Sequence, residues 1–289
     1  FETRILTMIL VERHFYKGNE QIIKLCKASK ELYNRCNYLV RQAWFSAKPL
    51  PSLTDLTDST KNLTCFKEFG IVRLAVQAIR AVLSDWSNYF KGLKASNNDS
   101  SGAKYRPKPP KYKEKLAQIT FDKQNIRRSR RSNLPVDWII PTNNCFSIPN
   151  INKRNLQQVV VTPKAFGFIV EIRYENIVIK ETVDKTKICT IDIGLNNLAT
   201  VTLDQMRPIL INGRIVKSIN QWFNKNICQK RSRKRYFRLE NYFHHVSKLI
   251  ISLCKQNNIG TIIIGLNKDW KRGINLGRKT NQHFGFIPY

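Results

Sequence analysis

Hydrophobic residues recur at spacings of three and four along two stretches of the chain, as in helices with one apolar face. The first stretch begins after Asn19, which can cap a helix, and covers residues 19–45. The second covers residues 72–93. Between them, residues 48–61 are polar and rich in Pro, Ser and Thr, and no helix or strand is predicted there. The pattern therefore predicts two amphipathic helices joined by a polar connection.

Short runs of β-prone residues lie on either side of the helices and predict strands. These runs are residues 5–15, 116–121, 145–148, 156–161 and 167–174. Their alternation, with turns between them, predicts a small antiparallel sheet or barrel. The first run is expected to pair with the later ones. The two helices would then be an insertion in a β-domain.

The last third of the chain opens with a predicted strand, tight turn and second strand over residues 187–203. Asp192 lies in the apolar run of the first strand, and Gly194 follows where the backbone must turn. A third strand at 208–212, a long helix at 219–256 and a buried, parallel-type strand at 261–265 complete the prediction. This order fits the first half of a ribonuclease-H-like sheet, whose first strand carries a metal-binding carboxylate. The alternative is that Asp192 is a structural residue that caps a turn.

The charge of the chain favours a polyanionic partner. Lys and Arg number 50 against 20 Asp and Glu, which gives a formal net charge of +30 and a pI near 10.1. Such an excess destabilises a compact chain by self-repulsion unless a polyanion neutralises it, and nucleic acid is the obvious one. The first half of the predicted long helix carries a series of cations with no acid between them. They are Lys225, Lys230, Arg231, Arg233, Lys234, Arg235 and Arg238. We expect this face to contact phosphates, although a merely solvated helical face is the alternative.

Residues 104–113 interleave Lys and Arg with Pro and Tyr. Proline keeps such a segment extended, and tyrosines offer stacking surfaces beside the cations. We call residues 104–113 the strap and predict that it grips nucleic acid, with a solvated linker as the alternative. The nucleic-acid contacts predicted here are Lys104, Arg106, Lys108, Lys111, Tyr112 and Lys113, continued by Arg127, Arg128, Arg130 and Arg131.

Several other classes of protein are disfavoured. The seven cysteines form no C-x-x-C pair and are expected to be small core residues in a reducing compartment. The histidines lack metal-ligand spacing, and His244-His245 is expected to be structural or solvent-facing. No apolar run reaches membrane-spanning length, and no signal peptide is visible. A cytoplasmic, nucleoid-associated protein is expected, with neither a membrane nor a small-molecule substrate as partner.

Taken in order, these motifs resemble the TnpB family, transposon-encoded RNA-guided nucleases related to the type V CRISPR effectors. The matching segment around the carboxylate is Ile191-Asp192-Ile193-Gly194-Leu195-Asn196-Asn197-Leu198-Ala199-Thr200. Further matches are residues 211–213, 217–221, 262–271, 274–277, 281–282 and 287–288, with 30–34 in the first helix and 109–112 in the strap. The resemblance implies an α+β protein. A wedge-like β-barrel would comprise residues 1–18 and 103–180, an inserted helical recognition lobe residues 19–102, and the N-terminal part of a RuvC, RNase-H-like domain residues 185–289.

The resemblance also implies guide RNA and target DNA as partners and Mg²⁺ as cofactor. Family nucleases hold two Mg²⁺ ions with three or more carboxylates. Asp192 matches the first of these, and Asp269 is a candidate for another, with a solvated loop carboxylate as its alternative. Gly265 stands where the second is often a Glu. The remaining carboxylates and a zinc ribbon are expected beyond Tyr289, so the chain is expected to be truncated and inactive alone.

Two other functions compete with a nuclease. One is a nuclease-dead, guided DNA-binding protein or decayed remnant, which binds without cutting. The other is a DNA-strand transferase. The absence of the His and Tyr arrangement of the transposase partner argues against the transferase.

Overall fold

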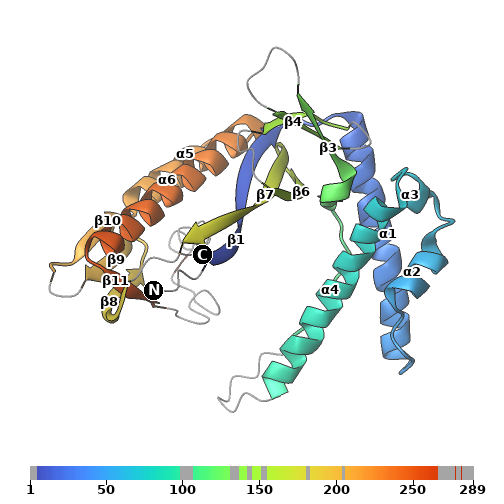
Figure 1. Cartoon of the computed structure of the whole chain (residues 1–289), viewed down its shortest axis with the longest axis horizontal. Coiled ribbons are helices and arrows are strands. Elements are labelled where there is room, and N and C mark those ends of the chain that lie inside the picture. Colours follow the sequence, from blue (N-terminus) through green and yellow to red (C-terminus); the bar gives the residue numbers. More distant parts are fainter. Residues whose placement is uncertain are drawn as a thin grey trace. The chain divides into compact units, whose positions relative to one another are not determined.

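The computed structural model describes residues 5–97, 107–130, 137–141, 145–150, 155–179, 183–203, 206–265, 277 and 281. The chain divides into two compact units, unit 1 with residues 1–179 and unit 2 with residues 180–289. Both contain helices and sheets, so the α+β class is confirmed (Figure 1). Asp269, Lys104, Arg106 and Arg131 lie outside the described residues.

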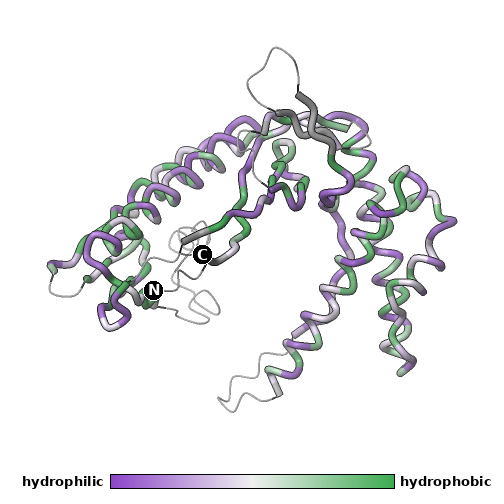
Figure 2. The backbone as a smooth tube through the Cα atoms, in the orientation of Figure 1, coloured by the Kyte–Doolittle hydropathy of each residue, from purple (hydrophilic) through white to green (hydrophobic). Residues whose placement is uncertain are grey.

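Two long helices of unit 1 confirm the first prediction. They are α1 (Glu20–Phe45) and α4 (Val72–Asn97), and Asn19 caps α1 by accepting a hydrogen bond from the Ile22 N–H at 2.9 Å. Figure 2 shows apolar and polar residues alternating along both helices, as expected of helices with one buried face. The buried stripe of α1 includes Ile22, Leu25, Leu32 and Val40.

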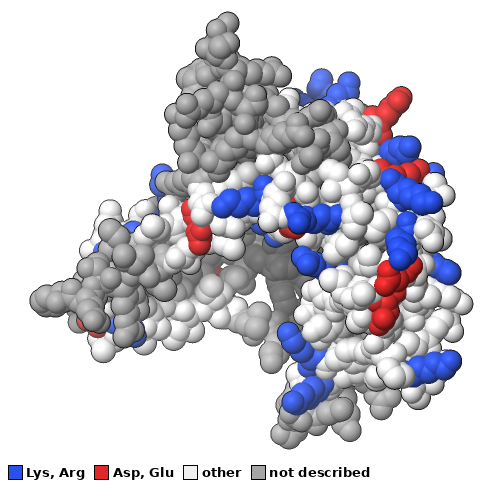
Figure 3. All heavy atoms as spheres, turned by 45° about the vertical axis from the view of Figure 1, so that its right-hand side comes forward, with Lys and Arg blue, Asp and Glu red and all other residues white. Residues whose placement is uncertain are grey.

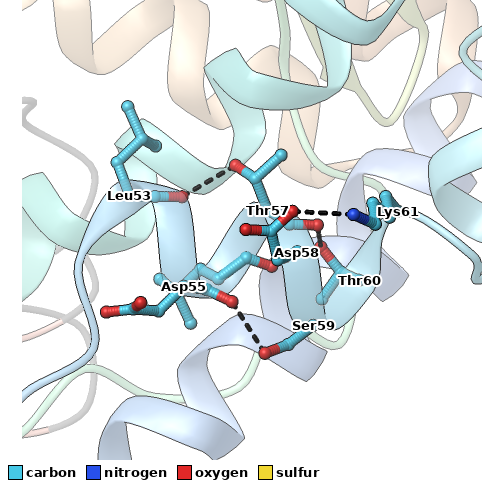
Figure 4. A network of polar contacts seen from close by, with 8 residues as sticks. Leu53, Asp55, Thr57, Asp58, Ser59, Thr60 and Lys61 are labelled. Atoms are coloured by element: carbon cyan, nitrogen blue, oxygen red, sulfur yellow. Dashed lines mark hydrogen bonds and ion pairs between the residues drawn. The ribbon is translucent and has the colours of Figure 1, made fainter.

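The polar segment at 48–61 contains a helix that the hydrophobic pattern did not predict. Helix α2 (Leu53–Thr60) starts in a capping box, because the Ser52 hydroxyl accepts from the Asp55 N–H while the Asp55 carboxylate accepts from the Ser52 N–H. Hydroxyls along α2 donate to carbonyls one turn earlier (Figure 4). The capping box and the buried Leu56 stabilise a helix that composition disfavours. A short helix, α3 (Thr64–Lys67), follows.

The described strands of unit 1 form two antiparallel sheets. The larger has the order β1-β7-β6-β2, from β1 (Ile5–Tyr16), β7 (Gly167–Ile179), β6 (Asn155–Lys164) and β2 (Ile119–Asp122). The pairing of the first strand with later ones is confirmed, since β1 pairs with β7 along its whole length. The smaller sheet contains β3 (Ile126–Arg130), β4 (Asp137–Pro141) and β5 (Ile148–Asn150), and a 3₁₀ turn, η1 (Lys123–Asn125), precedes it.

A closed barrel is not found among the described strands. Strands β1 and β2 are the two ends of the larger sheet and pair only with β7 and β6 respectively, so the described sheet is open. Helices and sheet share one apolar core, whose largest fully buried side chains include Trp86, Phe69 and Phe121. The finer division of unit 1 at residues 18 and 102 stays a prediction.

The described part of unit 2 contains a four-stranded sheet and two helices. The strand order is β10-β9-β8-β11, from β10 (Ile209–Asn212), β9 (Asn197–Leu203), β8 (Asp184–Ile193) and β11 (Ile259–Ile264). Strands β8, β9 and β10 are antiparallel, while β11 is parallel to β8 as predicted. The predicted burial of this strand is wrong for its last three residues, because Ile262, Ile263 and Ile264 are exposed. A second apolar core lies under this sheet.

The single helix predicted for residues 219–256 is wrong, because two helices occupy this part of the chain. Helix α5 (Arg214–Asn224) starts earlier, and α6 (Gln229–Gln256) begins after an extended Cys228. At the break, the Asn226 N–H bonds to the Phe223 carbonyl, three residues back. Two asparagines close together, Asn224 and Asn226, are poor helix formers and favour this interruption.

Candidate nucleic-acid interface

Asp192 lies near the end of β8, the strand between β9 and β11. Side chains of a strand alternate between faces, so Asp192 points away from its buried neighbours Cys189 and Ile191. Its side chain is exposed, and across the ladder it pairs with Thr200 of β9. An exposed carboxylate needs no buried partner, which explains how the apolar run of β8 tolerates it.

Position 265 is the strand neighbour of Asp192. The Gly265 N–H donates to the Ile191 carbonyl at 2.8 Å, continuing the parallel register of β11 and β8. A Cβ placed on Gly265 would lie 3.6 Å from Asp192 Oδ1. A side chain at position 265 would therefore lie beside the Asp192 carboxylate. Because the residue there is glycine, no side chain occupies that place.

The described residues do not complete a Mg²⁺ site. Among them, no group of three or more His, Cys, Asp or Glu side chains is placed to hold a metal ion. Mg²⁺ keeps several waters and takes few carboxylates, but two-metal hydrolysis requires several to converge. Asp192 would contribute one of these. The other candidate, Asp269, lies outside the described residues.

A tight turn next to Asp192 accounts for several motif residues of unit 2. The Gly213 N–H donates to the Asn196 carbonyl at 2.8 Å, and a Cβ on Gly213 would lie 2.4 Å from the Leu195 carbonyl oxygen. Lys217 Nζ donates to Asn196 Oδ1, and Asn212 Oδ1 accepts from the Arg214 N–H at 2.9 Å. These contacts fasten the β8–β9 turn to the start of α5, so they position the end of the Asp192 strand.

The cations of the α6 region divide into two groups by exposure. Lys225, Lys230, Arg233, Lys234 and Arg238 are exposed, whereas Arg231 and Arg235 are half-buried. The exposed members on α6 itself, Lys230, Arg233, Lys234 and Arg238, are called the α6 cation face below. No acid interrupts it from residue 229 to residue 239.

The half-buried arginines hold α5 against α6. Arg235 Nε donates to Oδ1 of the buried Asn220 at 2.7 Å, and its guanidinium lies 5.3 Å from the Phe223 ring centroid. Arg231 Nη1 donates to the Trp222 carbonyl at 3.2 Å and lies 5.1 Å from the Trp222 ring centroid. Burial lowers the pKa of Arg235 below its usual range. The sequence did not reveal this role, because the partner residues lie on a helix that was predicted as part of α6.

The described part of the strap lies extended along α1. Asn34 Nδ2 donates to the Lys113 carbonyl at 2.9 Å, and Asn34 Oδ1 accepts from the Lys113 N–H at 2.7 Å. The buried Asn37 donates to the Pro110 carbonyl at 3.1 Å and accepts from Trp86 Nε1 at 2.9 Å. The Ala117 N–H then bonds to the Cys26 carbonyl, so strap and helix run antiparallel. These asparagines were not predicted as strap anchors.

One predicted phosphate contact of the strap is engaged within the fold. Lys113 Nζ lies 3.7 Å from the centroid of the Tyr33 ring, and the Tyr33 hydroxyl donates to Asp85 Oδ2 at 2.6 Å. Burial lowers the pKa of Lys113, and burial together with the Asp85 hydrogen bond raises that of Tyr33. Lys108, Lys111 and Tyr112 are exposed. Arg127, Arg128 and Arg130 belong to β3, and their side chains lie outside the described part.

The fold and these surfaces define a mixed α+β protein with cation-rich faces. Figure 3 shows Lys and Arg side chains predominating over Asp and Glu on the visible face of the described residues. Among the helices described above, none combines the length and the apolar content that crossing a membrane requires. The candidate functional surfaces are therefore the α6 cation face, the strap and the end of β8 that carries Asp192.

Comparisons with known proteins give similarities only among solved structures. The chain matches no protein-family model and no curated protein. A cryo-EM structure of a Cas12f1–sgRNA–target DNA complex is similar, with 12% identity, a TM-score of 0.47, and 92% of this chain and 69% of that chain covered. A cryo-EM structure of a CRISPR-Cas12f ternary complex is similar with 13% identity, a TM-score of 0.35, and 92% and 68% of the two chains covered. At these sequence identities and TM-scores, neither similarity defines a family for this chain.

Proposed function

We propose that this chain is an RNA-guided, DNA-targeting nucleic-acid-binding protein of the TnpB and type V CRISPR kind, with a RuvC-like unit 2. The observation that carries the proposal is the sheet of unit 2. Three antiparallel strands are followed, after two helices, by a fourth strand parallel to the first, and Asp192 lies near the end of that first strand. An RNase-H-like nuclease places its first metal-binding carboxylate at this position.

The charge of the molecule indicates the ligand. A net charge of +30 favours a polyanion, and the α6 cation face offers four exposed cations with no intervening acid. In RNA-guided effectors such as Cas9, base pairing reads the sequence, while the protein holds the heteroduplex by its backbone. The proposed partners are accordingly a guide RNA and a target DNA, both gripped through phosphates.

A second candidate function is guided binding without cleavage. The observation that favours it is Gly265, which leaves Asp192 without a carboxylate on the neighbouring strand. Among the described residues, no set of acidic side chains replaces it. In this case Asp192 would persist as a remnant of a nuclease, and the chain would act by occupying DNA.

Salt-dependent RNA binding tests the grip. The change is to replace Lys230, Arg233, Lys234 and Arg238 together by Gln. Affinity for a structured RNA should fall for all sequences alike, and the slope of log K against log[salt] should lose up to about 3, at ~0.7 per phosphate contact. The matched control replaces four exposed lysines of unit 1, namely Lys24, Lys27, Lys61 and Lys67.

The control removes the same net charge, so it separates a local phosphate contact from the general field of the protein. A smaller loss in the control than in the α6 variant supports the proposal. Equal losses in both variants, or binding that does not respond to salt, would contradict it.

Plasmid nicking distinguishes the two candidate functions. The native chain and its Asp192→Ala variant are each incubated with guide RNA, a plasmid target and Mg²⁺. Guided binding without cleavage by either protein supports the second candidate. Cleavage by the native chain alone supports a nuclease whose site is complete within these residues.

A further inference from the structure

Three aromatic side chains and one arginine form a cluster where the strap meets α1. The cluster, called the Arg41 cluster below, consists of Tyr38, Arg41 and Phe45 on α1 and Tyr112 on the strap. The Arg41 guanidinium carbon lies 5.1 Å from the Tyr112 ring centroid and 6.0 Å from that of Phe45. Positions 38, 41 and 45 are three and four residues apart, so one face of α1 presents all three.

The rings of this cluster are exposed although burying them would be favourable. Tyr38 is 42% exposed, Tyr112 44% and Phe45 66%. Single exposed apolar residues are ordinary, but several large rings gathered in one patch mark an interaction surface. Aromatic rings also offer large contact area with little side-chain entropy to lose, which suits them to binding.

Arg41 is held by rings rather than by an acid. Within the described residues it forms no ion pair, and its buried Nε has no hydrogen-bond partner. The side chain therefore stacks beside Tyr112 and Phe45 without a carboxylate to neutralise it. A positive charge set between aromatic rings attracts an anion while leaving the rings open for stacking.

The strap presents Tyr112 from a fixed backbone. Both backbone groups of Lys113 bond to Asn34, and the Pro110 carbonyl bonds to the buried Asn37. These anchors lie on either side of Tyr112. A ring mounted in this way loses little freedom on binding, so contact with a ligand costs less than it would for a mobile loop.

The surroundings of the cluster favour a polyanion. No acid occurs from Leu32 to Thr54, and Glu114 is the one acid from Pro107 to Ala117. Arg35 lies 5.6 Å from the Tyr38 ring centroid, and Lys111 is exposed next to Tyr112. Alternating rings and cations are the surface on which single-stranded nucleic acids bind, because each base has a face to stack and each phosphate a charge to neutralise.

We propose that the Arg41 cluster binds unpaired bases of single-stranded nucleic acid. The rings of Tyr112, Phe45 and Tyr38 stack on successive bases, while Arg41 and Lys111 neutralise the phosphates between them. The site is tolerant of sequence, since stacking does not read base edges. This inference rests on the proposed function and deepens it by assigning a second surface, in unit 1, to strands that are not paired.

Binding of short oligonucleotides tests the cluster. Fluorescein-labelled 12-mers of uridine RNA and thymidine DNA are titrated with the full chain and read by anisotropy at fixed salt. The double variant Tyr112→Ala, Phe45→Ala should bind both about tenfold more weakly, which is ~1.4 kcal/mol. A 12-mer of abasic sites with the same phosphates should bind the native and variant proteins alike.

Matched variants separate stacking from general changes. Tyr112→Trp, Phe45→Trp should retain native affinity, because a larger ring also stacks. The control Ile9→Ala, Ile177→Ala removes exposed apolar side chains from β1 and β7 of the same unit and should leave affinity unchanged. If the double variant melts at a lower temperature than the native chain, the test is repeated with Phe45→Ala alone. That side chain is the most exposed of the cluster, so its loss should disturb the fold least.

The outcomes distinguish this inference from the function on which it rests. A protein that binds no oligonucleotide and no structured RNA overturns both. Native-like binding of the intact 12-mers by the double variant overturns the Arg41 cluster and leaves the proposed function standing. Stacking is also overturned as the cause if the double variant loses affinity for only one of the RNA and DNA 12-mers. The same holds if it loses as much affinity for the abasic strand as for the intact ones.

Discussion

Arg235 tests whether some cations of α6 pack against α5 while others bind nucleic acid. The change is Arg235→Gln, which removes the charged donor to Asn220 and the guanidinium that lies 5.3 Å from the Phe223 ring centroid. Asn220 is 5% exposed, so its Oδ1 would lose a partner that water cannot easily replace. The contact between α5 and α6 should weaken as a result.

The size of the effect follows from the two interactions. A buried acceptor deprived of a charged donor loses ~1–3 kcal/mol, and a partly exposed cation–π contact contributes ~0.5–1 kcal/mol. Relief of the desolvation of the guanidinium offsets part of this loss, as its lowered pKa indicates. A net loss of ~1–3 kcal/mol corresponds to roughly 5- to 150-fold more frequent opening of α5.

Hydrogen exchange of the amides of α5 measures this opening directly. The matched control is Lys234→Gln, which removes the same charge from an exposed neighbour on α6. The control should exchange like the native chain but lower the salt slope of RNA binding, by ~0.7 for one lost phosphate contact. Arg235→Gln should instead speed the exchange of the α5 amides and leave the salt slope of RNA binding unchanged. Equal exchange of α5 in the two variants would refute the assignment of Arg235 to packing.

Three further predictions concern the core, the response to pH and the metal site. Asn37→Ala should destabilise unit 1 by ~1–3 kcal/mol in urea unfolding, because the buried Trp86 indole N–H, now 2.9 Å from Asn37 Oδ1, would lose its acceptor. Burial raises the pKa of the Cys26 thiol from 9.0 to about 12, so its contribution to stability is present below about pH 9 and is lost as pH rises toward 12. Urea unfolding across this window should show a pH slope shallower by ~1.4 kcal/mol per unit in Cys26→Ala than in the native chain. Gly265→Glu should create Mn²⁺ binding that calorimetry detects, since the Cβ at position 265 would lie 3.6 Å from Asp192 Oδ1. If Gly265→Glu still bound Mn²⁺ after Asp192→Ala was added to it, that result would contradict the geometry.

Much of the secondary structure was readable because burial imposes a period on it. The apolar stripe of α1 recurs with the helical repeat, and Asn19 marks the start of that helix, so both were predictable from local sequence. The uninterrupted apolar run of β11 indicated a buried, parallel strand. The register with β8 confirms that it is parallel, but Ile262, Ile263 and Ile264 are exposed. Helix α2 escaped prediction because a capping box and the buried Leu56 stabilise it, while its composition resembles a loop.

The candidate site was less predictable than the elements that carry it. Asp192 stood out because a carboxylate in an apolar run is unusual, and the structure places it near the end of its strand with an exposed side chain. The cations around α6 were identified as one set by their charge. Which of them face solvent depends on α5, whose Asn220 and Phe223 engage Arg235. No local pattern in the sequence records that contact.

By itself, the sequence determined the α+β fold class, most of the described strands and long helices, and the sign of the charge, because these depend on composition and on short-range periodicity. The tertiary structure alone decided that the described sheet of unit 1 stays open, that Lys113 packs under Tyr33, and that Gly265 stands beside Asp192. Each of these depends on residues far apart in the chain. Their proximity is set by strand register and by the packing of one element on another, and the spacing of side chains along one element carries no information about its neighbour.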